Sequence, residues 1–228
     1  MSAAAPATAA PGGGGGTLVD RGRFIALEGG EGAGKSTQAR LAAEALAARG
    51  FDVVLTREPG GTEGAEALRA LLLDPAREWG ARAEALLFAA ARADHVERLI
   101  RPALAAGRWV ICDRFLDSSR AYQGGAGGLQ DADLLALHRI GSEGLLPDLT
   151  VLLDLPEEIA AARARGRDGG ADDRIAGKGE AYHHRVAGGF DALARAEPHR
   201  FMRVSGAGEA DVVHRAVMAT LRRFLVSA

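Results

Sequence analysis

The chain has 228 residues, of which 47% are hydrophobic and 25% are charged, the composition of a soluble globular domain with a sizeable core. Its 28 Lys and Arg residues are balanced by 30 Asp and Glu residues, and the net charge of −2 argues against a nonspecific nucleic-acid binder. No apolar run is long enough to cross a membrane, and the single Cys112 excludes an internal disulfide. We therefore expect a cytoplasmic protein with neither a nucleic-acid nor a membrane partner.

The N-terminal residues 1–21 are rich in alanine, proline and glycine, and they lack the basic and bulky apolar regions of a signal peptide. We expect them to form a flexible tail. Residues 22–228 are expected to form a single domain, because this length suits one hydrophobic core.

Within the domain, short apolar runs of strand length alternate with helical patterns. Thr62 is the expected N-cap of the second helix. The alternation predicts an α/β fold with a five-stranded parallel sheet and helices on both faces. The expected strands cover residues 23–28, 51–56, 108–113, 149–154 and 201–204, and the expected helices cover 37–46, 62–73, 81–106, 131–143, 157–165 and 209–225, with one more helix before the last strand.

A glycine-rich loop separates the first strand from the first helix and has the form G-x-x-x-x-G-K-[ST] from Gly29 to Ser36. Such loops wrap successive backbone N–H groups around nucleotide phosphates. Lys35 and Lys178 are the chain's two lysines, so a compact ammonium stands at the position where a phosphate loop needs one. We predict a P-loop NTPase fold that binds a nucleoside triphosphate through Gly29, Gly30, Glu31, Gly32, Ala33, Gly34, Lys35, Ser36 and Thr37.

Ligands of parallel sheets bind beyond the carboxyl ends of the strands. This rule places residues 29–37, 57–61, 113–123 and the segment after Asp154 at one rim, where they can share a site. Asp113 can hold magnesium there, and Arg114 offers a fork to a phosphate.

The segment of residues 166–179 is rich in glycine and charge and has no hydrophobic period, so we expect a mobile surface segment. His183 and His184 follow it, with no third ligand at metal spacing, and we expect no zinc site.

Together these motifs resemble bacterial thymidylate (dTMP) kinases from about Gly22 to the C-terminus. Phe88 and Arg92, four residues apart on one helical face, match the family, although alone they fit a core residue beside a solvated one. The resemblance rests further on residues 29–37, 56–62, 113–124 and 147–150; the second and third of these ranges, in this order and spacing, are the specific ones.

The resemblance implies an ATP:dTMP phosphotransferase that makes dTDP for dTTP biosynthesis, uses Mg²⁺ and forms a homodimer. Lys35 and the loop amides would hold the β- and γ-phosphates of ATP, and Ser36 with Asp113 would place Mg²⁺. The dTMP phosphate is already a competent nucleophile, so we expect no general base and in-line transfer aided by Lys35 and Arg114.

The resemblance also implies the acceptor site. Phe88 would stack on thymine, and Arg92 would hydrogen-bond its exocyclic oxygen. Tyr122 would pack near C2′ and disfavour a ribose. The other implied roles are Arg69 and Arg114 on the dTMP phosphate, Ser119 and Gln123 beside the base and sugar, and Glu31 and Glu58 near the 3′-hydroxyl and the magnesium-water shell.

The segment of residues 166–179 resembles the family's short lid, which supplies a catalytic arginine in cis when the phosphate loop carries none. The candidates are Arg163, Arg165, Arg167 and Arg174; Arg174 is the first choice, and Arg165 is also assigned as catalytic. Two positions depart from the family pattern: Ala176 stands where an acidic residue is common, and Arg120 is unusually bulky.

Two alternatives stay open at this point. The chain could phosphorylate another nucleoside monophosphate, or it could be a non-catalytic nucleotide-binding regulatory module. A regulatory module would not need an aromatic and arginine base pocket beside a second phosphate site.

Overall fold

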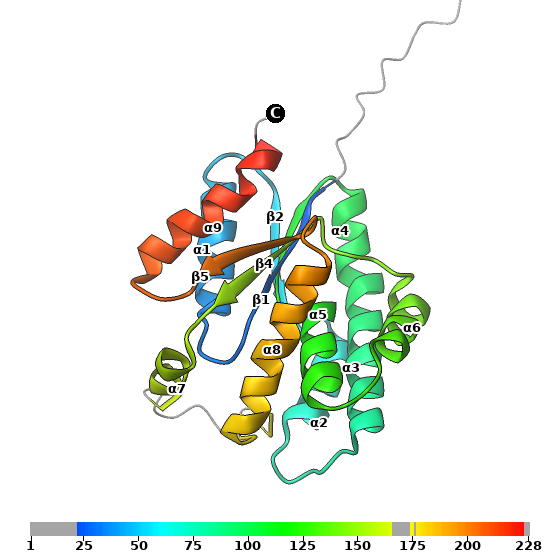
Figure 1. Ribbon diagram of the computed structural model, residues 1–228. Helices are drawn as coiled ribbons and strands as arrows, with labels where there is room; N and C mark the ends of the chain where they lie inside the picture. The colour runs from blue at the N-terminus through cyan, green and yellow to red at the C-terminus, as the bar shows by residue number, and fades with distance from the viewer. Residues whose placement is uncertain (1–21, 166–173, 176, 226–228) are drawn as a thin grey trace, which may run out of the picture.

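The computed structural model describes residues 22–165, 174–175 and 177–225 (Figure 1). The predicted tail over residues 1–21 lies outside the described residues, as do positions 166–173 and 176 of the predicted lid and the last three residues.

A five-stranded parallel sheet forms the centre of the described chain, in the order β2-β3-β1-β4-β5. The strands are β1 (Phe24–Glu28), β2 (Val53–Arg57), β3 (Trp109–Asp113), β4 (Leu149–Asp154) and β5 (Phe201–Ser205). Every residue of β1 is buried, as expected for a central strand covered on both faces. The predicted α/β class and parallel sheet are confirmed.

The register of the sheet aligns the strand ends that carry the predicted site. Leu27 of β1 pairs with Asp113 of β3, and Glu28 pairs with Leu152 of β4. The phosphate loop therefore leaves the sheet beside the end of β3, at the rim where the sequence predicts ligands.

On one face of the sheet lie α1 (Lys35–Ala47) and α9 (Ala210–Leu225), side by side in Figure 1. Their apolar sides close a core with the inward residues of the strands, and α1 is rich in alanine, the strongest helix former. The large buried members of this core include Leu46, Ile111, Val151, Val217 and Leu221.

The other face is covered by α3 (Ala81–His95), the π-helical turn η1 (Val96–Ile100), α4 (Arg101–Ala105) and α5 (Leu116–Ser119). Phe24 and Phe115 meet edge to face in this core, with their ring centroids 4.8 Å apart. The remaining helices are α2 (Glu63–Leu73), the π-helical segment η2 (Arg120–Ala126), α6 (Asp131–Ser142), α7 (Glu157–Arg165) and α8 (Glu180–Ala196).

The structure refines several expected elements. Thr62 is the N-cap of α2 and accepts a hydrogen bond from the Ala65 amide, as predicted. The predicted helix over residues 81–106 is continuous but contains the π-helical turn η1. Residues 116–126, for which no helix is expected from sequence, form α5 and η2. No helix of the described chain is long and apolar enough to cross a membrane.

Candidate active site

The phosphate loop begins where β1 ends and has a backbone that other residues resist. Gly29 has a φ of 142°, and a Cβ there would lie 2.5 Å from the Leu153 carbonyl oxygen. Gly34, with a φ of 88°, is the N-cap of α1. The first turn of α1 has neither a side-chain cap nor an acidic residue, so its amides remain available to a phosphate.

Lys35 is buried at the start of α1 and donates a 2.7 Å hydrogen bond to the Gly30 carbonyl. Burial, aided by the nearby Arg114 guanidinium, lowers the pKa of Lys35 to about 8. This ammonium is poorly solvated and close to the loop amides, an arrangement that favours a phosphate ligand.

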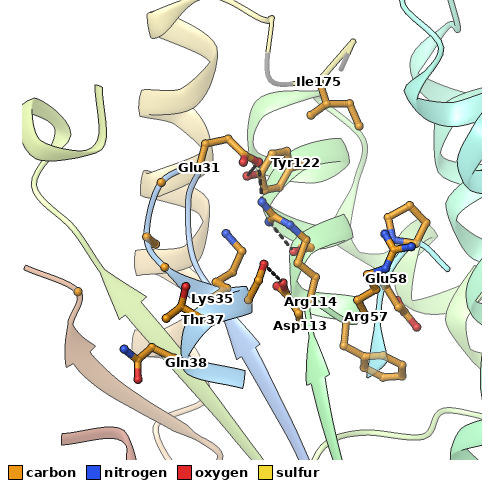
Figure 2. A pocket seen from close by; sticks show the side chains of 18 of the residues that line it. Glu31, Lys35, Thr37, Gln38, Arg57, Glu58, Asp113, Arg114, Tyr122 and Ile175 are labelled. Atoms are coloured by element: carbon orange, nitrogen blue, oxygen red, sulfur yellow. Dashed lines mark hydrogen bonds and ion pairs between the residues drawn. The ribbon is translucent and has the colours of Figure 1, made fainter. Parts of the chain in front are cut away.

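Asp113 and Ser36 meet between β3 and α1. Ser36 Oγ donates a short hydrogen bond to Asp113 Oδ2 (dashed in Figure 2). Asp113 Oδ1 is buried and has no hydrogen-bond partner within the described chain. A hydroxyl and an unpaired carboxylate oxygen beside a phosphate loop are hard oxygen donors that suit Mg²⁺. The described residues hold no cluster of three or more His, Cys, Asp or Glu side chains that could bind a metal alone, so further ligands would come from phosphate and water.

Arg114 follows Asp113 and reaches back over the phosphate loop, as Figure 2 shows. Its φ is 69°, an uncommon value for a residue with a side chain. Nη2 forms a 2.5 Å ion pair with Glu31, and Nη1 donates to the Gly29 carbonyl and to Ser118 Oγ at 3.3 and 3.2 Å. The uncommon backbone conformation thus places the guanidinium of Arg114 between the phosphate loop and Tyr122.

Tyr122, in η2, contacts both Glu31 and Arg114. Its hydroxyl donates a 3.0 Å hydrogen bond to Glu31, and the Arg114 guanidinium carbon lies 5.0 Å from its ring centroid. Burial raises the pKa of Tyr122, which keeps its hydroxyl protonated.

A pocket next to Arg114 is lined by Arg92 and Glu58. Arg92 Nε donates a 2.7 Å hydrogen bond to Glu58, and Nη2 donates to Ser119 Oγ at 2.9 Å. Burial opposes ionisation of Glu58, but Arg92 and His95 hold the pKa of this carboxyl below its ordinary value. The Glu58–Pro59 peptide is cis, and Arg69 donates to the Pro59 carbonyl at 2.8 Å.

One cavity of about 820 Å³ joins the phosphate loop to this pocket. Lys35 and Phe88 both line it, so the sheet does not separate the triphosphate cradle from the aromatic side chain. The other predicted site residues that line it are Glu31, Gly32, Ala33, Gly34, Ser36, Thr37, Glu58, Arg69, Arg92, Asp113, Arg114, Ser119, Tyr122 and Gln123.

The sequence of this chain matches the Thymidylate kinase family model over residues 27–217. A thymidylate kinase of Rhizorhabdus wittichii is 58% identical to it over 90% of this chain and 99% of that protein. One from Caulobacter vibrioides is 51% identical over 87% and 95%. The crystal structure of thymidylate kinase from Ehrlichia chaffeensis has a TM-score of 0.73 and 32% identity, covering 88% of this chain and 99% of that one.

The chain belongs to the thymidylate kinase family. Its activity is the phosphorylation of dTMP to dTDP with ATP as the donor. The fold and the activity expected from the sequence are confirmed, and neither of the two alternatives left open by the sequence is supported.

The predicted lid arginines lie in different surroundings. Arg163 lines the cavity and donates 3.0 Å hydrogen bonds to the carbonyls of Gly206 and Gly208. Arg174 forms a 2.5 Å ion pair with the buried Glu84 and does not line the cavity. The side chain of Arg165 and all of Arg167 lie outside the described residues.

Sequence reasoning missed part of the candidate site. The loop after β5 and the start of α9 line the cavity through Gly206, Gly208, Ala210 and Val213. The rule for strand ends, applied to the fifth strand as well as the first four, predicts this contribution. Glu84 was also missed: it accepts a hydrogen bond from Gln123 Nε2 at 2.9 Å. No local pattern distinguishes this glutamate from a surface residue of α3.

Proposed function

We propose that the cavity binds ATP and dTMP end to end and that the γ-phosphoryl group passes directly to the dTMP phosphate, in line. The observation that carries this proposal is the shared cavity, which Lys35 and Phe88 both line. Arg114 lies between the two halves, where the charge of the transferring group develops. Alignment and charge neutralisation then provide most of the catalysis, because the acceptor phosphate needs no deprotonation by the protein.

On the donor side, the phosphate-loop amides and Lys35 bind the β- and γ-phosphates. Ser36 and Asp113 would hold Mg²⁺, which would neutralise charge on those phosphates. The unpaired Asp113 Oδ1 supports this assignment.

On the acceptor side, Phe88 stacks on thymine and Arg92 donates to the exocyclic oxygen of the base. Arg69 and Arg114 bind the 5′-phosphate. Tyr122 lies near the sugar, and the other polar residues of the pocket are Glu31, Ser119 and Gln123. The proposal is supported by the lining of the cavity, in which all these side chains take part.

A lid arginine completes the charge balance in this proposal. As in the sequence analysis, Arg174 is the first candidate for this arginine, and Arg165 is also assigned as catalytic. Arg174 must leave Glu84 to reach a phosphate, so the ion pair of 2.5 Å competes with catalysis.

We also propose that the protein is located in the cytosol, as expected from the sequence.

We further propose that the chain forms a homodimer through α3 and α6, which pack against each other. Both helices expose large apolar side chains: Leu86 on α3 is 56% exposed and Ile140 on α6 is 78% exposed. Burial of such side chains favours association. Sedimentation velocity of the Leu86→Glu, Ile140→Glu double variant should give a monomer from a dimeric parent, and a monomeric parent contradicts the proposal.

The acceptor assignment is tested by initial rates of ADP formation with dTMP, dUMP, UMP, CMP, AMP and GMP. We expect dTMP to give the highest kcat/KM, because a pocket built around polar donors rejects bases that lack the matching acceptor. Equal rates with dTMP and with AMP or CMP contradict the assignment. Turnover that does not depend on any acceptor contradicts direct transfer.

A further inference from the structure

His95, the last residue of α3, is fully buried beneath the acceptor pocket, and both of its ring nitrogens are engaged. Nδ1 lies 3.0 Å from Glu58 Oε1, and Nε2 lies 2.8 Å from the hydroxyl of Thr56. An ionised carboxylate only accepts hydrogen bonds, so Nδ1 is the donor to Glu58.

The second oxygen of Glu58 holds Arg92. Arg92 Nε donates to Glu58 Oε2 at 2.7 Å, while Nη2 donates to Ser119 Oγ and to the Phe115 carbonyl. These contacts fix the guanidinium plane on two sides. Nη1 donates to no group of the described chain, and Arg92 lines the cavity, so this edge is the one left for a ligand.

The network is mostly buried, although Glu58 and Arg92 also line the cavity. Thr56, Glu58 and Arg92 are all buried, and Gly61 closes over the histidine. A Cβ on Gly61 would lie 2.5 Å from Thr56 Oγ1 and 2.6 Å from His95 Nε2. His95 itself is fully buried, and in such surroundings hydrogen bonds are stronger and an unpaired group is costly.

We propose that His95 is a positioning residue for base selection: it fixes the Glu58 carboxylate, which orients the Nη1 edge of Arg92 toward the exocyclic position of the acceptor base. A guanidinium donates only, so the fixed edge favours the carbonyl oxygen of thymine and disfavours the amino group of cytosine. The inference rests on the proposed contact between Arg92 and the base. It also assigns Glu58 to Arg92 and His95, not to the magnesium-water shell expected from the sequence.

The test compares kcat/KM for dTMP and dCMP in the full-length enzyme. In His95→Leu, both polar contacts are lost and Glu58 Oε1 is left unpaired; we expect the dTMP/dCMP ratio to fall about tenfold or more, mainly through KM for dTMP. KM for ATP should stay within about twofold, because the phosphate loop is untouched. His95→Asn, whose amide can still donate near the Nδ1 position, should recover part of the ratio.

His138→Leu is the matched control. His138 is the other buried histidine of the described chain; its Nε2 contacts the Leu145 carbonyl, and it makes no hydrogen bond to Glu58. We expect this variant to lose stability without a change in the dTMP/dCMP ratio. A purely structural role for His95 predicts that His95→Leu behaves in the same way.

Two further variants separate the possible failures. Thr56→Val keeps the side-chain shape and removes the partner of Nε2, so it should shift the ratio in the same direction even where His95→Leu does not fold. Arg92→Lys tests the underlying contact. If Arg92→Lys leaves the dTMP/dCMP ratio unchanged, the role of Arg92 in base selection is overturned. If Arg92→Lys changes the ratio but folded His95→Leu or Thr56→Val does not, only the role of His95 is overturned.

Discussion

Asp113 at the end of β3 accepts a hydrogen bond from Ser36 in the first turn of α1, while its second carboxylate oxygen is buried without a partner in the described chain. A buried, unpaired carboxylate oxygen is costly in a folded protein unless a ligand completes it. The pairing therefore joins two elements distant in sequence beside the phosphate loop, at the position where the proposed function has Mg²⁺ bind.

Asp113→Asn should raise the Mg²⁺ concentration needed for the half-maximal rate by at least about tenfold, since an amide oxygen carries no charge for the ion. The measurement is the initial rate as a function of free Mg²⁺ at fixed ATP and dTMP. Asp133→Asn, an exposed change on α6, is the control and should leave the curve in place. An unmoved curve for Asp113→Asn would remove Asp113 from the metal site.

Lys35 gives a pH dependence with a defined sign. Its pKa is lowered to about 8, mainly by burial, so the ammonium of the free enzyme loses its proton as the pH rises through that value. Because kcat/KM reports the free enzyme, kcat/KM for ATP should decline above about pH 8. Lys35→Arg keeps its charge at high pH, so this variant should be less active than the parent but should show no decline in kcat/KM above about pH 8. A flat profile to pH 10 in the parent enzyme contradicts the role of the charge.

Glu28 gives a second pH effect, on stability. It is fully buried at the end of β1 and accepts hydrogen bonds from the amides of Phe115 and Ser118. Burial, with the negative charge of Asp117 nearby, raises the pKa of Glu28 from 4.5 to about 7. Between these values the folded state binds more protons than the unfolded state, so the contribution of Glu28 to stability is full below pH 4.5 and is lost as the pH rises toward 7.

The difference in unfolding free energy between the parent and Glu28→Gln isolates this contribution. From pH 5 to pH 8, the unfolding free energy of the parent should fall by about 2 to 3 kcal/mol relative to that of Glu28→Gln, as the shifted pKa requires. Urea unfolding at several pH values measures it. A difference that stays constant, or that shifts in favour of the parent, contradicts the raised pKa.

Asp117 anchors a buried ionic network with Arg120 and Arg200. It accepts two hydrogen bonds from Arg200, at 2.6 and 2.7 Å, and it pairs with Arg120 at 3.3 Å. Removal of one partner leaves uncompensated buried charge, so Asp117→Asn should lower the unfolding free energy by about 3 to 5 kcal/mol. Asp211→Asn, which breaks an exposed pair with Arg215, should leave the urea midpoint unchanged. A loss below about 1 kcal/mol for Asp117→Asn would contradict the network's role in stability.

The parallel sheet and the phosphate loop were predictable because their signals are local. The apolar run of β1, the glycines after it and the alanine-rich α1 each follow from backbone geometry and helix propensity. The helical state of α5 and η2 was not predictable, because it depends on tertiary packing. A Cβ on Gly125 of η2 would lie 3.1 Å from Gly189 of α8, so the glycines serve a close helix contact and do not mark a loop.

The candidate site shows the same division. Asp113 was identified from its place at the end of a strand, and Phe88 and Arg92 from the family resemblance; all three line the cavity. His95 and Glu84 form hydrogen bonds with partners 37 and 39 residues away, and no sequence period reports such a pairing. Arg120, a departure from the family pattern, is explained by Asp131 and Glu197, which accept its hydrogen bonds at 2.7 and 2.6 Å.

The most direct test of the account uses one molecule that spans both halves of the cavity: adenosine and thymidine joined 5′ to 5′ through five phosphates. Inhibition kinetics of the full chain should show it to be competitive with ATP and also with dTMP, because the phosphate loop and the Phe88 pocket open into one cavity. Competition with only one of the two nucleotides would contradict direct transfer within a shared site.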